Sequence, residues 1–192
     1  MNEHALRVLE FNIVRQELAG LTACSLGREK AEAMVPSDHL SHVREILKDT
    51  TECRALIDIR GNLPLGGVTD IRPLIRKSTI GSSLDPRELL DVQNTISSAR
   101  SLKAFLQRLD DFPRMAAQAG SLGLYPTLES EISAAIAPNG QINDNATPDL
   151  ARIRSRKKTT AQRMIDRLNA IVSGPMRTML QDPVIVQRGD RY

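Results

Sequence analysis

The chain has 192 residues, with 26 Lys and Arg against 23 Asp and Glu, and only 3% of its residues are aromatic. This length suffices for one ordinary domain with a sizeable core, and the scarcity of aromatic residues favours packed helices over sheets. No apolar run reaches membrane-spanning length and no secretory signal opens the chain, so we expect a cytoplasmic protein without membrane contact.

Apolar residues recur at helical spacing from the start of the chain. A first stripe, residues 6–18, ends near Gly20. Ser25 is suited to cap a short second helix, and Ser37 or Asp38 to begin a third. Helix therefore follows helix in the first third of the chain.

The middle of the chain alternates turn chemistry with further helices. Gly and Pro within residues 60–67 predict a loop. Asp85-Pro86-Arg87-Glu88 supplies an N-cap, a Pro at the first helical position and an acidic first turn, and opens a helix to about Leu109, the longest of this part. The other elements expected here are a short helix around Leu74 and Ile75, a broken helical stretch over 112–124 and a compact helix over 128–136.

A long helix is predicted from Thr147 to Val172. Thr147-Pro148 is a start signal and Gly174-Pro175 a stop signal. At about 1.5 Å per residue this helix would reach roughly 39 Å, so we expect it to protrude. Because its middle, residues 154–160, has no apolar stripe, we expect the helix to lean on a second helix outside the chain.

The last residues, 182–192, predict a strand over Val184–Val186 and a turn, without a second strand to pair with. An unpaired strand arm indicates that the chain is the amino-terminal piece of a larger protein. The predicted fold is thus all-α, with a multi-helix core, a long protruding helix and a short β segment at the C-terminus.

Positive charge gathers in the last quarter of the chain. Residues 1–145 hold sixteen Lys and Arg against nineteen Asp and Glu, whereas residues 146–192 hold ten against four. This segregation points to a polyanion partner, although the same residues could instead solubilise an exposed helix and pair with acids on a missing partner. The residues predicted to approach nucleic-acid phosphates are Arg152, Arg154, Arg156, Lys157, Lys158, Arg188 and Arg191, with further charge from Arg163 and Arg167.

The sequence contains no recognisable catalytic, cofactor or metal site. No GxxxxGK[ST] phosphate loop is present, and the glycine pairs are better explained as turns. His39 and His42 lack other ligands nearby, and Cys24 and Cys53 lack a CxxC spacing, so we expect ordinary histidines and reduced thiols.

Several motifs resemble the second bacterial MutS subfamily, the one bearing a small MutS-related nuclease domain. The central ones are Leu65-Gly66-Gly67-Val68-Thr69-Asp70-Ile71-Arg72-Pro73-Leu74-Ile75-Arg76, Ile80-Gly81 and Leu84-Asp85-Pro86-Arg87-Glu88-Leu89-Leu90. The outer ones are Ala5-Leu6-Arg7-Val8-Leu9-Glu10-Phe11, Thr147-Pro148-Asp149-Leu150-Ala151-Arg152-Ile153-Arg154 and residues 182–192. Their order and spacing cover essentially the whole chain.

The resemblance implies a helical core (1–145), an ascending lever helix (146–173) and a truncated start of a clamp (174–192). In such proteins the core and lever connect an ATPase dimer to a clamp around nucleic acid. It also implies that the ATPase, which uses ATP and Mg²⁺, the nuclease domain and the homodimer contacts lie downstream. DNA and ribosomal RNA are both candidate ligands, because the family is implicated in restraining recombination and in rescuing stalled ribosomes.

Three hypotheses follow. The first is a non-catalytic core and lever that transmits nucleotide state to a clamp. The second is an independent helical module that binds nucleic acid or protein. The third is an enzyme of another kind, for which the sequence offers no site.

Overall fold

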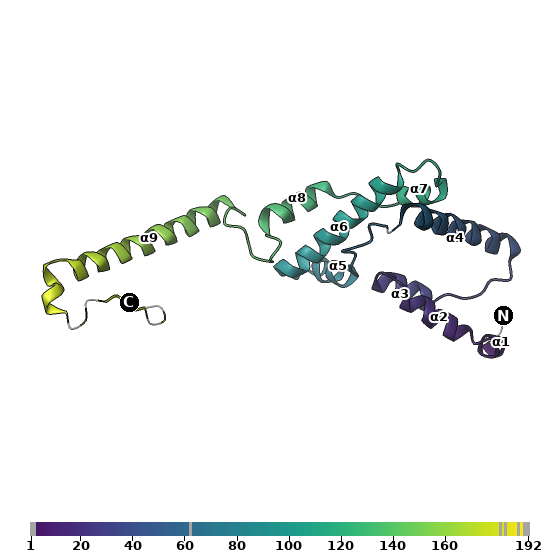
Figure 1. Cartoon of the computed structure of the whole chain (residues 1–192), viewed down its shortest axis with the longest axis horizontal. Coiled ribbons are helices and arrows are strands. Elements are labelled where there is room, and N and C mark those ends of the chain that lie inside the picture. Colours follow the sequence, from purple (N-terminus) through teal and green to yellow (C-terminus); the bar gives the residue numbers. More distant parts are fainter. Residues whose placement is uncertain (1–2, 62, 181, 183, 188, 190–192) are drawn as a thin grey trace. The chain divides into compact units, whose positions relative to one another are not determined.

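The computed structural model describes residues 3–61, 63–180, 182, 184–187 and 189. These residues form nine α-helices and one 3-10 helix, which confirms the all-α prediction (Figure 1). The chain divides into two compact units, Met1–Gln141 and Ile142–Tyr192. None of the helices in the described ranges is both long and apolar enough to cross a bilayer.

The described part of the first unit contains eight helices. Pro opens three of them, α6, α7 and α8, at the position where a missing N–H costs nothing. In chain order the helices are α1 (Glu3–Val8), α2 (Phe11–Gly20), α3 (Ser25–Glu32), α4 (Leu40–Arg60), α5 (Arg72–Thr79), α6 (Pro86–Leu106), α7 (Pro113–Gly120) and α8 (Pro126–Ala135).

Helix α6 begins where the sequence predicts. The Asp85 carboxylate accepts hydrogen bonds from the backbone N–H groups of Arg87 and Glu88, and the Glu88 carboxylate accepts one from the Asp85 N–H at 2.7 Å. Lys77 also donates to Glu88 at 2.7 Å, and this contact lowers the pKa of that carboxyl. The helix ends at Leu106, and its 21 residues equal those of α4, so it is not longer than every other helix of this unit.

Two clusters of buried apolar residues hold α4 to α8 together, and α6 contributes to both. One joins α4, the end of α6 and α7, around the fully buried Leu56. The other joins α6 and α8 through Val92, Ile96, Ile132 and Ile136. Helix α6 is therefore the central element of this unit.

The stripe over residues 6–18 forms two helices, so the prediction of one continuous helix is wrong. The chain turns at Leu9 and Glu10, where Glu10 adopts φ 51° in the left-handed region. Helices α2 and α3 then pack together as a hairpin. Arg72 of α5 binds the Glu29 carboxylate of α3 with both terminal nitrogens and also pairs with Asp70, so it links the hairpin to α5.

The second unit is built on α9 (Pro148–Ser173) and a 3-10 helix, η1 (Pro175–Met179), which packs against it. Thr147 caps α9 by accepting the Leu150 N–H at 3.1 Å, which confirms the predicted start. Its 26 residues make it longer than any other helix in the described part of the chain.

The predicted β segment near the C-terminus is not seen. Val184–Gln187 carry no strand assignment, and no strand is drawn among the described residues (Figure 1). A strand is stabilised by hydrogen bonds to a neighbouring strand, and no other described segment provides one. The run of β-branched residues at 184–186 was therefore insufficient to produce sheet structure.

Candidate nucleic-acid interface on helix α9

Five of the seven residues predicted to contact nucleic acid lie on α9. They are Arg152, Arg154, Arg156, Lys157 and Lys158, and the helix brings them together within two turns. The other two, Arg188 and Arg191, lie outside the described residues.

Two of these five cations have partners inside the second unit. The Arg152 guanidinium lies 3.1 Å from a carboxylate oxygen of Asp149, one turn earlier, and both side chains are well exposed. Arg154 donates to the Ile142 carbonyl at 2.9 Å and pairs with Asp144. Arg154 therefore ties the segment that precedes α9 to the helix, and its guanidinium is already engaged.

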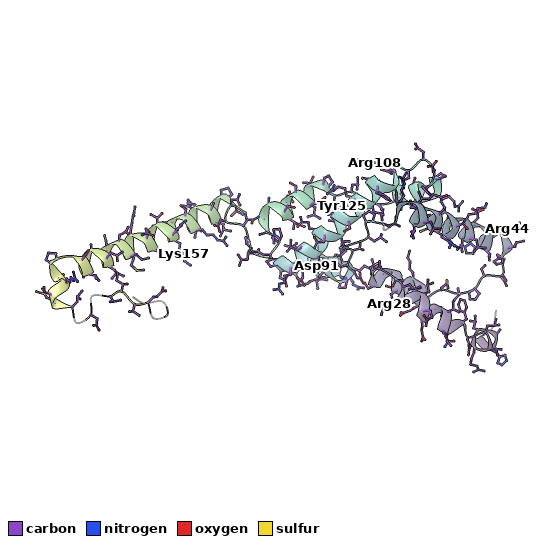
Figure 2. The ribbon with its side chains drawn as sticks, viewed as in Figure 1. Arg28, Arg44, Asp91, Arg108, Tyr125 and Lys157 are labelled. Atoms are coloured by element: carbon purple, nitrogen blue, oxygen red, sulfur yellow. The ribbon has the colours of Figure 1, made fainter. Side chains whose placement is uncertain are left out.

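The remaining three, Arg156, Lys157 and Lys158, are exposed and make no hydrogen bond or ion pair with any described residue. Figure 2 labels Lys157 on α9. Adjacent residues of a helix point in different directions, about 100° apart, so these three cations do not form one compact site. They can attract phosphates as separate point charges.

Helical spacing divides the charge over two lines. Arg152, Arg156, Arg163 and Arg167 are separated by four, seven and four residues, which places them along one side of α9. Lys157 lies on a second line, four residues after Ile153 and three residues before Thr160. Ile153, Arg156, Lys157, Thr160, Ala161 and Met164 together line a shallow depression of about 450 Å³.

Apolar side chains on α9 remain uncovered. Ile153 is 59% exposed, Met164 42% and Ile171 43%, and no described residue of the helix is buried. The helix contains no aromatic residue on which nucleic-acid bases could stack. Its chemistry permits sequence-independent phosphate contact and apolar contact with another macromolecule.

No group of three or more metal-ligating side chains gathers within the described ranges. His39 approaches Asp38 at 3.7 Å, with both side chains more than four-fifths exposed. Both cysteines are free thiols. No such group among the described residues could hold Mg²⁺, and we assign no step to Mg²⁺ or ATP in this chain.

Sequence reasoning missed the role of Asp144. Its pairing with Arg154 spans ten residues and depends on the path of the loop before α9, which leaves no periodic signal. The position of Lys157 on one helix line with Ile153 and Met164 could be predicted, because spacings of three and four residues define a helix face.

Curated relatives were found, whereas no protein-family model matches the chain. Endonuclease MutS2 of Geobacillus sp. (strain WCH70) is 38% identical over 197 residues, which cover the whole chain and 25% of that protein. Endonuclease MutS2 of Symbiobacterium thermophilum is 38% identical over 192 residues, covering 100% of the chain and 24% of that protein, and the Bacillus cereus (strain Q1) protein is 36% identical with 25% covered. The chain thus spans about a quarter of the length of these relatives. Along its entire length it is homologous to part of the MutS2 endonucleases, the subfamily that its motifs resemble.

Proposed function

We propose that this chain is the non-catalytic core and lever of a MutS2-type protein, and that it couples an ATPase outside the chain to a nucleic-acid clamp. Residues 1–145 act as the core, 146–173 as the lever and 174–192 as the entry to the clamp. The observation that carries the proposal is α9, a 26-residue helix without a buried residue. Homology to proteins named endonuclease adds a nucleic-acid context.

A long helix suits the transmission of movement. At about 1.5 Å per residue, α9 spans roughly 39 Å, and its backbone hydrogen bonds make it stiff along its axis. A displacement at one end is therefore delivered to the other end with little loss. Its exposed apolar line requires another element alongside it, because an isolated helix gains little stability from its own residues.

The first unit also exposes apolar side chains. Their exposure favours the hypothesis that the chain is part of a larger protein over the hypothesis of an independent module. Leu40, Ile46 and Leu47 of α4 are between 48% and 62% exposed, and Val14 and Leu18 of α2 are 51% and 40% exposed. Val14 and Leu18 are four residues apart, and Leu40 and Leu47 seven, so each pair lies on one face of its helix. Exposed apolar faces of this kind are typical of contact with further protein. An independent nucleic-acid-binding module is the alternative, and tight binding by the 192-residue chain alone would favour it.

Nucleic acid is the proposed ligand of the clamp, as DNA or ribosomal RNA. On α9, Lys158 is exposed and unpaired within the described part of the chain, and it is available to phosphates. Such contact is indifferent to sequence and weakens steeply with salt.

A chimera tests the coupling role. The matching quarter of the Geobacillus protein is replaced by this chain, and Thr159→Pro is introduced at the exposed centre of α9. Proline removes a helix hydrogen bond and kinks the helix. We expect basal ATP hydrolysis to remain and its response to nucleic acid to disappear, while Thr159→Ala preserves both. An unchanged response in Thr159→Pro would refute the lever role.

A further inference from the structure

One exposed face of α9 has the spacing of a helix-pairing seam. Ile153, Lys157, Thr160, Met164, Arg167 and Ile171 follow one another at intervals of four, three, four, three and four residues, the pattern that keeps side chains on one line against a partner helix. We call these six residues the seam. All six are exposed, and four of them line the depression described above.

The two flanks of the seam differ in charge. Arg156 and Arg163 each precede a seam residue by one position and form one flank, whereas Ala161 and Leu168 each follow a seam residue by four positions and form the other. No acidic group among the described residues pairs with Arg156, Arg163 or Lys157, whereas Arg152 and Arg154 both have carboxylate partners. Arg156, Arg163 and Lys157 therefore leave uncompensated positive charge along the seam, and Lys158 leaves one more charge on another side of the helix.

Lys157 requires an opposite charge on any helix that packs against the seam. A helix packed on the seam would remove its ammonium group from water, and a desolvated charge is costly unless an opposite charge meets it. Carboxylates on the partner would satisfy Lys157 and the arginine flank together.

We infer that the seam binds an amphipathic α-helix whose apolar face is bordered by carboxylates, with acids opposite Arg156 and Arg163 and one within reach of Lys157. The inference rests on the proposed role of α9 as one half of a lever, and it specifies the chemistry of the other half. The occupant is thus defined by an acidic flank and an apolar line.

A second copy of the chain fits the seam poorly. In a parallel pair Lys157 would face Lys157, and in an antiparallel pair the arginine flanks would meet each other, so both arrangements oppose like charges. Duplex nucleic acid fits poorly too, because phosphates would leave Ile153, Met164 and Ile171 without apolar contact. An acidic helix satisfies the charges and the apolar side chains at once.

Two designed peptides serve as probes for the 192-residue chain. Both are fluorescent three-heptad helices with Leu along the apolar line, one flanked by Glu and the other by Lys. At fixed ionic strength we expect the Glu peptide to bind at least about tenfold more tightly, as anisotropy titration would measure. Equal binding of the two peptides, or binding of neither, would overturn the inference.

Charge reversal locates the contact. Arg156→Glu with Arg163→Glu is expected to invert the preference, so that the Lys peptide binds more tightly. The matched control, Lys158→Glu with Arg177→Glu, makes the same change of charge in the same unit outside the arginine flank and is expected to retain the preference. Circular dichroism of both double variants verifies that α9 is retained.

Met164→Ser separates seam packing from diffuse attraction, and we expect it to weaken the Glu peptide by about fivefold or more while duplex DNA binding stays unchanged. Equal effects of the two charge reversals would mean that diffuse charge explains binding. A duplex weakened selectively by the seam reversal would assign the flank to phosphates, and a dimer lost in Met164→Ser would assign it to a second copy. Each of these outcomes overturns the inference and leaves the coupling role to be decided by the chimera.

Discussion

The two units obtain their helices in different ways. In the first, α4, α6, α7 and α8 enclose buried residues such as Leu56 and Ile132, so tertiary contact and helical spacing agree. In the second unit, α9 is longer than any of those four helices, yet none of its described residues is buried. Caps and composition can therefore specify a helix clearly while leaving its packing partner undefined.

The largest expected contrast comes from equivalent truncations in the two units. Leu56→Ala is expected to lower the free energy of unfolding by about 2–5 kcal/mol, because it leaves a cavity beneath α7. Ile153→Ala removes a side chain that is 59% exposed and should change it by less than about 0.5 kcal/mol. Urea denaturation measures both, and similar losses would mean that α9 is covered after all.

The next largest effect is expected from removing a hydrogen bond between α4 and α7. Glu52 of α4 accepts the Met115 N–H of α7 at 2.8 Å, and so caps α7 from another helix. Glu52→Ala should cost about 1 kcal/mol, as the loss of an N-cap does. Asp58→Ala on the exposed part of the same helix is the control, and an equal loss there would contradict the capping role.

The same kind of cap should behave differently in the two units. Asp85→Ala and Thr147→Ala each remove an N-cap, worth about 1 kcal/mol to the local helix. Because α6 contributes to both buried clusters, Asp85→Ala should lower the unfolding midpoint of the first unit. Thr147→Ala should reduce amide protection only in the first turn of α9, which hydrogen exchange would detect; a shift of the midpoint by Thr147→Ala would show that the units unfold together.

The smallest expected effect is a pH dependence of the link between the α2–α3 hairpin and α5. Hydrogen bonds from the Arg72 side chain, and then from its backbone N–H, lower the pKa of Asp70 from 3.8 to about 2. A lowered pKa in the folded state stabilises it above the unfolded value, and this contribution is lost as pH falls through about 2. Carboxyl titration by NMR should show the shift, and Arg72→Gln should return the pKa toward 3.8.

Local chemistry explains which elements could be predicted. Asp85 and Thr147 accept backbone hydrogen bonds from the next turn, so their helix starts were readable from the sequence. Cys24 and His39 precede α3 and α4 without a side-chain cap, so those starts fell a residue or two from expectation. The break at Glu10 was not predictable, because a positive φ is rare outside Gly, Asn and Asp.

The candidate site divides in the same way. The positions of Arg156 and Lys157 follow from helical spacing alone. The engagement of Arg154 by Asp144 depends on the loop before α9, which has no periodic signal. The predicted strand failed for a related reason, since its stability depends on a neighbour that the pattern of Val184–Val186 cannot supply.

The capping of α7 by Glu52 has a consequence for synthesis. Glu52 and Met115 are 63 residues apart, so a nascent chain contains all of α4 before it contains the backbone that α4 holds. At typical translation rates this interval lasts roughly 3–13 s. During this time Met115, which lines a groove together with Cys53 and Ile57 of α4, has not yet been synthesised. The growing chain therefore offers α4 to chaperones before its own fold can cover it.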